Sequence, residues 1–360
     1  MTTAPLASTT RRLHRPLLAT TAGMTVLAVV SLCAMAFDDR MLLNESVWLK
    51  SLKFAFAFAL YTGTLAWLLS FPHRGQRLTW WMGTAFAVTA TADVGFIAVQ
   101  AARGTFSHFN NYDTDTVNVI GQHVFQYGVP GLFLANLVIA LMLSWQKITD
   151  LPTTRAIHYG LGIAVVGMAL AYFMGYGGKQ EVTDAYGKPV TLISGHTIIN
   201  GQPVVRDGLG EMPVSHWSTV GGDMRIPHFV GLHGIQILIL AALVLARLAP
   251  QVPWLRSERA RADLIRVLAV GYAGLLGTLL WQALRGQPVT HPDGKTLAAL
   301  GAVVAVTAAG LGLVYAVRGR TADTSPTVLE APASMFDVTE PLPALSAGAQ
   351  RPVSAPPARR

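Results

Sequence analysis

The chain has 360 residues, of which 52% are hydrophobic and 13% are charged, and its mean hydropathy is +0.43. A soluble globular protein carries about 25% charged residues, so this composition argues against a soluble enzyme, a disordered protein and a nucleic-acid-binding domain. The formal net charge of +8 does not require a nucleic-acid partner, because the basic residues follow a membrane-topology pattern.

The apolar residues form eight blocks of about twenty residues, the length needed to cross a bilayer. They predict an all-α integral membrane protein with a bundle of about eight transmembrane helices. We expect a cytoplasmic N-terminus (1–16) followed by a polytopic transmembrane domain (17–317). The predicted spans cover residues 17–37, 52–71, 80–101, 124–145, 156–176, 228–248, 264–285 and 296–317.

The first block has features of both a signal peptide and an anchor. Three arginines precede it, and the Ala-Met-Ala sequence at 34–36 resembles a signal-peptidase site. Because a signal h-region is usually about 7–15 residues long and this block is longer, we expect an uncleaved anchor. The single cysteine, Cys33, lies inside the block, which excludes an intrachain disulfide and a thiolate metal cluster.

Lys and Arg in the short loops predict the orientation. With the N-terminus in the cytoplasm, fourteen basic residues fall on the inner side and six in the short outer loops. We therefore predict a multi-pass plasma-membrane protein with both termini in the cytoplasm. The six outer residues are Arg40, Lys50, Lys53, Arg103, Arg285 and Lys295.

Two segments lie outside the predicted spans. Residues 177–227 contain Asn200-Gly201 between β-prone runs, which predicts a hairpin, and a second hairpin is expected around 185–188. We interpret 177–227 as a small β-containing extracytoplasmic cap, with a disordered loop as the alternative. Residues 318–360 are rich in Pro, Ala and Ser and predict a disordered cytoplasmic tail.

A histidine pattern occurs twice, in residues 107–126 and 215–236. Each copy has Ser-His followed by an aromatic and a polar residue, and then Gly-x-His-x-x-Gln, which raises the hypothesis of an internal repeat. His123 with Gln126, and His233 with Gln236, are each three residues apart and share one helix face. Chance similarity is the alternative.

These histidines are the predicted cofactor site. If the two helices face each other, His123 and His233 would ligate a haem or a transition metal, supported by Gln126 and Gln236. His108 and His216 are further candidate metal ligands. The alternative is that each histidine is interfacial and bonds only to a carbonyl or to water.

Asp93 is the single acid deep in a predicted span. Ionisable groups in the hydrocarbon are costly and usually face the bundle interior or a cavity, so Asp93 is the candidate catalytic residue, handling protons or coupling an ion. The alternative is a neutral, hydrogen-bonded structural acid. Lys50 and Lys53 at the outer end of the second span would contact lipid headgroups or an anionic ligand, or simply snorkel to the interface.

Three functions remain open from the sequence. The leading hypothesis is a haem- or metal-dependent membrane redox protein that exchanges electrons with a quinone or another lipid-soluble substrate. The second is a transporter or channel with Asp93 as its coupling site, and the third is a structural or signalling membrane component. The expected partners are the lipid bilayer and a small lipid-soluble molecule, and no nucleotide-binding or hydrolase motif assigns an enzyme class.

Overall fold

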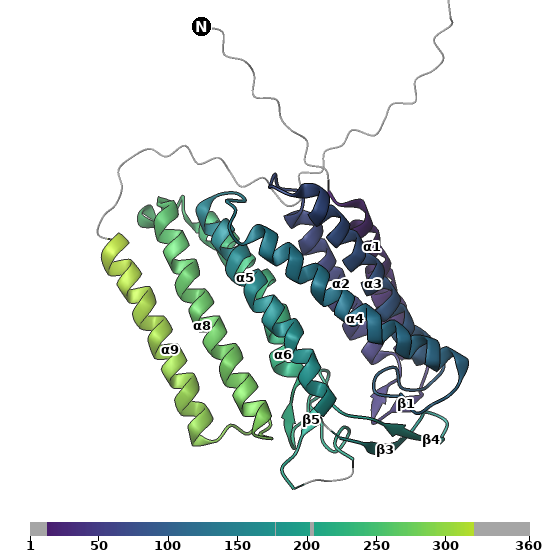
Figure 1. The fold of residues 1–360 in the computed structure, drawn as a ribbon. Coiled ribbons are helices and arrows are strands. Elements are labelled where there is room, and N and C mark those ends of the chain that lie inside the picture. The colour runs from purple at the N-terminus through teal and green to yellow at the C-terminus, as the bar shows by residue number, and fades with distance from the viewer. Residues whose placement is uncertain (1–12, 177, 202–204, 320–360) are drawn as a thin grey trace, which may run out of the picture. The chain divides into compact units, whose positions relative to one another are not determined.

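A computed structural model describes residues 13–176, 178–201 and 205–319. These residues are mostly helical, with three small two-stranded sheets gathered at one end of the helices (Figure 1). The helices in chain order are α1 (Arg15–Phe37), α2 (Leu49–Leu68), α3 (Gln76–Ala102), α4 (Thr116–Leu143), α5 (Leu151–Leu170), α6 (Arg225–Leu232), α7 (Gly234–Leu248), α8 (Glu258–Leu284) and α9 (Gly294–Val314), with short helical turns at Ala171–Tyr176, Pro253–Arg256 and Tyr315–Gly319.

The helices confirm the predicted all-α bundle, and their lengths and apolar composition are consistent with a membrane protein. Seven of the described helical segments are long and apolar enough to cross a membrane, and the count rises to eight if α6 and α7 form one broken span. These two helices meet at His233 with a bend of 43°. The chain is therefore a multi-pass membrane protein whose sixth predicted span is bent near its N-terminal end.

The start of α4 differs from the prediction, which placed it at residue 124. The helix begins at Thr116 because the carboxylate of Asp115 accepts hydrogen bonds from the backbone N–H groups of Val117 and Asn118, an N-cap that satisfies free donors of the first turn. Asp115 also pairs with Arg103 at 2.8 Å. The additional turns carry polar residues toward the end of the bundle where the sheets lie.

The helices pack in two neighbouring groups. The first three pack on one another and α3 packs along α4, while α5 contacts α6, α7 and α8. At the edge of the bundle α9 lies against α8 (Figure 1), and Thr296 is its one buried residue. An apolar helix that is nearly unburied by protein is suited to contact with lipid.

Four of the strands lie in the segment 177–227, where the sequence predicted a small β-containing cap, and two more, at residues 41–46, were not predicted. One sheet pairs β1 (Met41–Leu42) with β2 (Glu45–Ser46), and another pairs β3 (Gln180–Thr183) with β4 (Pro189–Leu192), which confirms the hairpin around 185–188. The C-terminal end of α3 lies at this end of the bundle too. The carbonyl of its last residue, Ala102, accepts a hydrogen bond from Arg40, and Arg40 also donates to the hydroxyl of the hairpin residue Tyr186.

The hairpin predicted at Asn200-Gly201 does not form among the described residues, because its first strand has a different partner. Strand β5 (Thr197–Ile198) precedes Asn200-Gly201 as expected, but it pairs with β6 (Gly222–Asp223). The buried carboxylate of Asp223 holds β6 in place, since it accepts hydrogen bonds from the backbone of Ser218 and from the Arg225 guanidinium. The predicted tail lies outside the described residues beyond Gly319, as does most of the N-terminal segment.

Candidate functional site

A cavity of about 320 Å³ lies beneath the cap, between α2, α3, α4, α5 and α6. This volume is within the range of small-molecule binding sites. Its deeper walls are apolar and rich in aromatic rings, whereas its cap end carries charged and imidazole side chains. The apolar lining includes Phe54, Phe58, Ile97, Phe125, Leu132 and Phe229.

Lys50 is the unpaired cation of this cavity. It lies in the first turn of α2 and lines the cavity wall. Among the described residues, no side chain or carbonyl forms a hydrogen bond or ion pair with its ammonium group. Glu45 and Asp207 attract the ammonium from a distance, but a half-buried charge without a direct partner is costly, so this position is suited to a negatively charged ligand.

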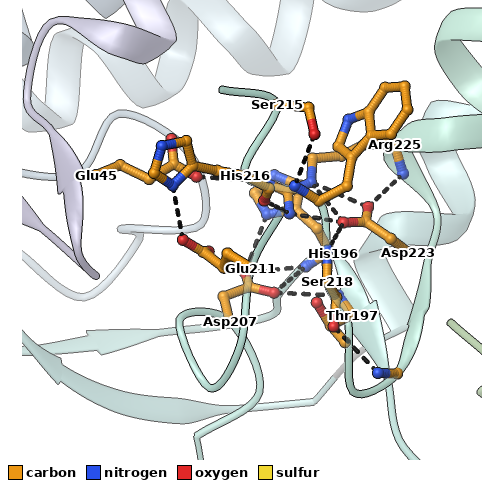
Figure 2. Close-up of polar contacts among 12 residues, drawn as sticks. Glu45, His196, Thr197, Asp207, Glu211, Ser215, His216, Ser218, Asp223 and Arg225 are labelled. Atoms are coloured by element: carbon orange, nitrogen blue, oxygen red, sulfur yellow. Dashed lines mark hydrogen bonds and ion pairs between the residues drawn. The ribbon is translucent and has the colours of Figure 1, made fainter. Parts of the chain in front are cut away.

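Two other cations at the cap end are already paired, and Figure 2 shows one of them, Arg225, beside Asp223. The Lys53 ammonium lies 3.3 Å from a carboxylate oxygen of Glu45 and donates to the Ser215 carbonyl. The Arg225 guanidinium pairs with Asp223 at 2.6 Å and lies 3.6 Å from the second oxygen of Glu45. These bonds fasten the cap loop to the ends of α2 and α6.

His196 and Asp207 form a close pair in the cap wall of the cavity. Asp207 accepts from His196 Nδ1 at 3.0 Å and from the backbone N–H groups of His196 and Thr197 at 3.1 Å. Burial alone would raise the pKa of Asp207, but His196, Arg225 and the backbone donors together hold it well below its usual range. Burial lowers the pKa of His196, and the attraction of Asp207 offsets part of that effect.

His228 is positioned by a close contact between α5 and α6. Its Nδ1–H donates to the Gly167 carbonyl at 2.7 Å, and the helices approach so closely that a Cβ on Gly167 would lie 2.2 Å from the Leu232 backbone nitrogen. Because a carbonyl only accepts, Nδ1 carries the proton and Nε2 of the neutral ring is an acceptor. For the same reason Nδ1 of His196, which faces the Asp207 carboxylate, carries the proton, and its Nε2 is an acceptor.

His108 also lines the cavity, where it contacts the aromatic wall. Its ring packs 4.4 Å from the Phe125 ring, and its Nδ1 lies 3.1 Å from the Ser107 hydroxyl. Burial lowers the pKa of His108 well below its ordinary value, and the nearby Lys50 adds to that effect. The loop that precedes α4 thus places a neutral imidazole at the cap end of the cavity.

Of the predicted metal ligands, His216 is the one that lies in a group with metal-ligand spacing. Within the described residues, Glu45, Glu211 and His216 have ligand atoms within 4.8 Å of one another. His216 Nδ1 lies 2.9 Å from Glu211, and Glu45 is paired with Lys53 and Arg225. In this geometry the three residues belong to the ion-pair network that closes the cap (Figure 2).

The predicted haem pair lies outside the cavity. His123 and Gln126 are exposed on α4, where the His123 ring stacks on Tyr127. His233 is at the break between α6 and α7, and its buried Nδ1 has no hydrogen-bond partner. Gln236 donates to the Thr64 hydroxyl. The two Gly-x-His segments therefore have different local structures, and a haem or metal bound by them stays a prediction.

Asp93 lines the cavity within α3 and is 5% exposed. Its Oδ1 is buried without a hydrogen-bond partner. The sequence therefore identified a side chain of the cavity, although it placed the cofactor site around other residues.

Sequence reasoning did not single out the His196–Asp207 pair. The two residues are eleven positions apart on either side of a loop, so no helical or strand periodicity connects them. Comparison with protein-family models, with curated proteins and with solved structures found no match.

Proposed function

We propose that this protein binds a lipid-soluble amphiphile with a carboxylate head in the cavity beneath the cap. The observation that carries the proposal is the Lys50 ammonium, which lines a largely apolar cavity and forms no hydrogen bond or direct ion pair with the described residues, although Glu45 and Asp207 lie near enough to attract it. A ligand with an anionic head and an apolar tail would satisfy both parts of this environment. Binding of this kind fits the redox hypothesis, which predicted a lipid-soluble substrate.

The charges around the cap end argue against a ligand with more than one negative charge. Lys53 and Arg225 are engaged by Glu45 and Asp223, which leaves one unpaired cation for the ligand. Glu211 and Asp207 also line the cavity, and their carboxyl groups disfavour a second negative charge. A carboxylate is therefore a better partner than a phosphate monoester.

The neutral imidazoles offer no hydrogen-bond donor to a carboxylate head. His196 and His228 each have Nδ1 bonded to an acceptor of the protein, so each Nε2 is itself an acceptor, and the Lys50 ammonium is the group that would donate to the head. The aromatic rings deeper in the cavity supply apolar surface for a tail, whose burial contributes roughly 25 cal/mol per Å². The predicted topology would place the head near the outer membrane surface.

Equilibrium binding to delipidated, detergent-purified protein tests the proposal. We expect displacement of a fluorescent fatty acid by oleic acid at concentrations at least tenfold lower than by oleyl alcohol or lysophosphatidic acid. Lys50→Gln should weaken oleic acid binding at least tenfold and leave oleyl alcohol binding unchanged. Lys295→Gln, at an exposed lysine of α9, is the matched control.

Three results would overturn the proposal. One is equal binding of the acid and the alcohol, and another is oleic acid binding in Lys50→Gln that matches the Lys295→Gln control. The third is a folded wild-type protein that binds none of the probes. Preference for lysophosphatidic acid over oleic acid would reject the carboxylate head specifically.

A further inference from the structure

The carboxyl group of Asp93 is a second unpaired polar group in the same cavity. No described residue forms a hydrogen bond with it, and its Oδ1 is buried without a partner. The side chain lines the cavity and is 5% exposed. Burying a polar group without a hydrogen bond costs free energy, so a partner that enters the cavity would be stabilising.

Asp93 lies far below the head-binding end of the cavity. It precedes Ala102, the last residue of α3 at the cap end, by nine positions in the helix. At a rise of 1.5 Å per residue, this is about 14 Å along the helix axis. Lys50, by contrast, is in the first turn of α2 at the cap end. The two unpaired groups are thus at different depths of one cavity.

None of the described residues donates a hydrogen bond to Asp93 Oδ1. Across the helix contact, Gly128 of α4 leaves room for the carboxyl, since a Cβ there would lie 2.4 Å from Asp93 Oδ1. The cavity wall on either side is formed by the apolar residues Ile97, Phe125 and Val129. Because Oδ1 packs toward Gly128, a donor supplied from within the cavity would reach the carboxyl group at Oδ2, which also forms no hydrogen bond with the described residues.

We propose that Asp93 accepts a hydrogen bond from a hydroxyl group in the tail of the bound amphiphile. The ligand class is then a hydroxylated fatty acid, or a carboxylic amphiphile of similar shape, with its acid at Lys50 and its hydroxyl at Asp93. This inference rests on the proposed function and narrows its ligand. A purely hydrocarbon tail would leave the Asp93 carboxyl unsatisfied.

Ricinoleic acid and oleic acid provide a matched pair of probes, since they differ by one mid-chain hydroxyl. In the displacement assay we expect wild-type protein to bind ricinoleic acid at least tenfold more tightly than oleic acid. Asp93→Leu should abolish that preference while retaining oleic acid binding. Asp93→Asn keeps a carbonyl acceptor and should retain part of the preference. Asp39→Asn, at an exposed aspartate, is the control.

The outcomes separate this inference from the proposed function. Equal wild-type binding of the two acids would overturn the role of Asp93 and leave the carboxylate site in place. A ricinoleic acid preference that persists in Asp93→Leu would also overturn it. Failure of the wild-type protein to bind either acid would instead reject the proposed function. The Asp93→Asn variant is the control for misfolding in Asp93→Leu, because the asparagine side chain has nearly the same shape as aspartate.

Discussion

His196 Nδ1 lies 3.0 Å from a carboxylate oxygen of Asp207, and the same carboxylate accepts the backbone N–H groups of His196 and Thr197. The pair fastens β5 to the loop that contains Asp207. It also fixes the His196 ring so that its second nitrogen is free to act as an acceptor. The cap wall of the cavity therefore depends on a buried carboxylate whose partners are almost all in one short segment.

Removing this carboxylate should destabilise the cap. Asp207→Ala would leave the His196 ring and two backbone donors without their acceptor, and loss of one partner from a buried ionic cluster costs about 3 kcal/mol or more. Thermal unfolding in detergent, followed with limited proteolysis at the cap, measures the effect. Glu181→Ala, at an exposed residue of β3, should change stability little. Similar proteolysis rates for the two variants would contradict the prediction.

The stability of the cap should fall at mildly acidic pH. Burial lowers the pKa of His196 in the folded protein, whereas an unfolded histidine titrates near about 6.5. Between these values the unfolded chain binds more protons, so stability is greatest above about pH 6.5 and declines as the pH falls. The midpoint of thermal unfolding, measured from pH 8 to pH 5, should decline less steeply in His196→Gln than in wild type. A change of equal size in His291→Gln, at an exposed histidine, would argue against the assignment.

The contact between α5 and α6 should tolerate no side chain at Gly167. Gly167→Val would force Cβ toward the Leu232 backbone, which a Cβ would approach to 2.2 Å. It would also displace the carbonyl that orients His228. We expect a loss of about 3 kcal/mol and weaker fatty-acid binding. Gly162→Val on the same helix has no atom within 4 Å of the new Cβ and should retain both properties.

The predicted topology can be tested with the single native cysteine removed. In a Cys33→Ser background, Tyr186→Cys places a thiol in the exposed β3–β4 hairpin, and Gln251→Cys places one in the exposed loop after α7. A membrane-impermeant maleimide should label the cap thiol in intact cells and the other thiol after permeabilisation. The reverse pattern would invert the predicted orientation.

The hypothesis of a haem or metal held by His123 and His233 has a direct optical test. It predicts a Soret band, or stoichiometric bound metal, in protein purified in mild detergent, and loss of that signal in His123→Ala and His233→Ala. A folded wild-type protein without colour or metal would reject the hypothesis. The cavity-based proposal does not depend on the result, because neither histidine lines the cavity.

The sequence by itself determined the membrane-spanning architecture, because transmembrane segments are defined by their own length and hydropathy. It predicted the hairpin around 185–188 through local turn chemistry, and it identified Asp93 because a lone acid in an apolar helix is conspicuous. These features depend on residues that are adjacent in the chain.

Only the tertiary structure decided which polar groups meet. His196 and Asp207 come together because the cap folds back on itself, and β5 finds its partner in β6 through the buried Asp223. Lys50 is unpaired because the neighbouring acids bind Lys53 and Arg225 instead. Such pairings depend on long-range packing and on competition among several charges, which the spacing of residues along one chain does not specify.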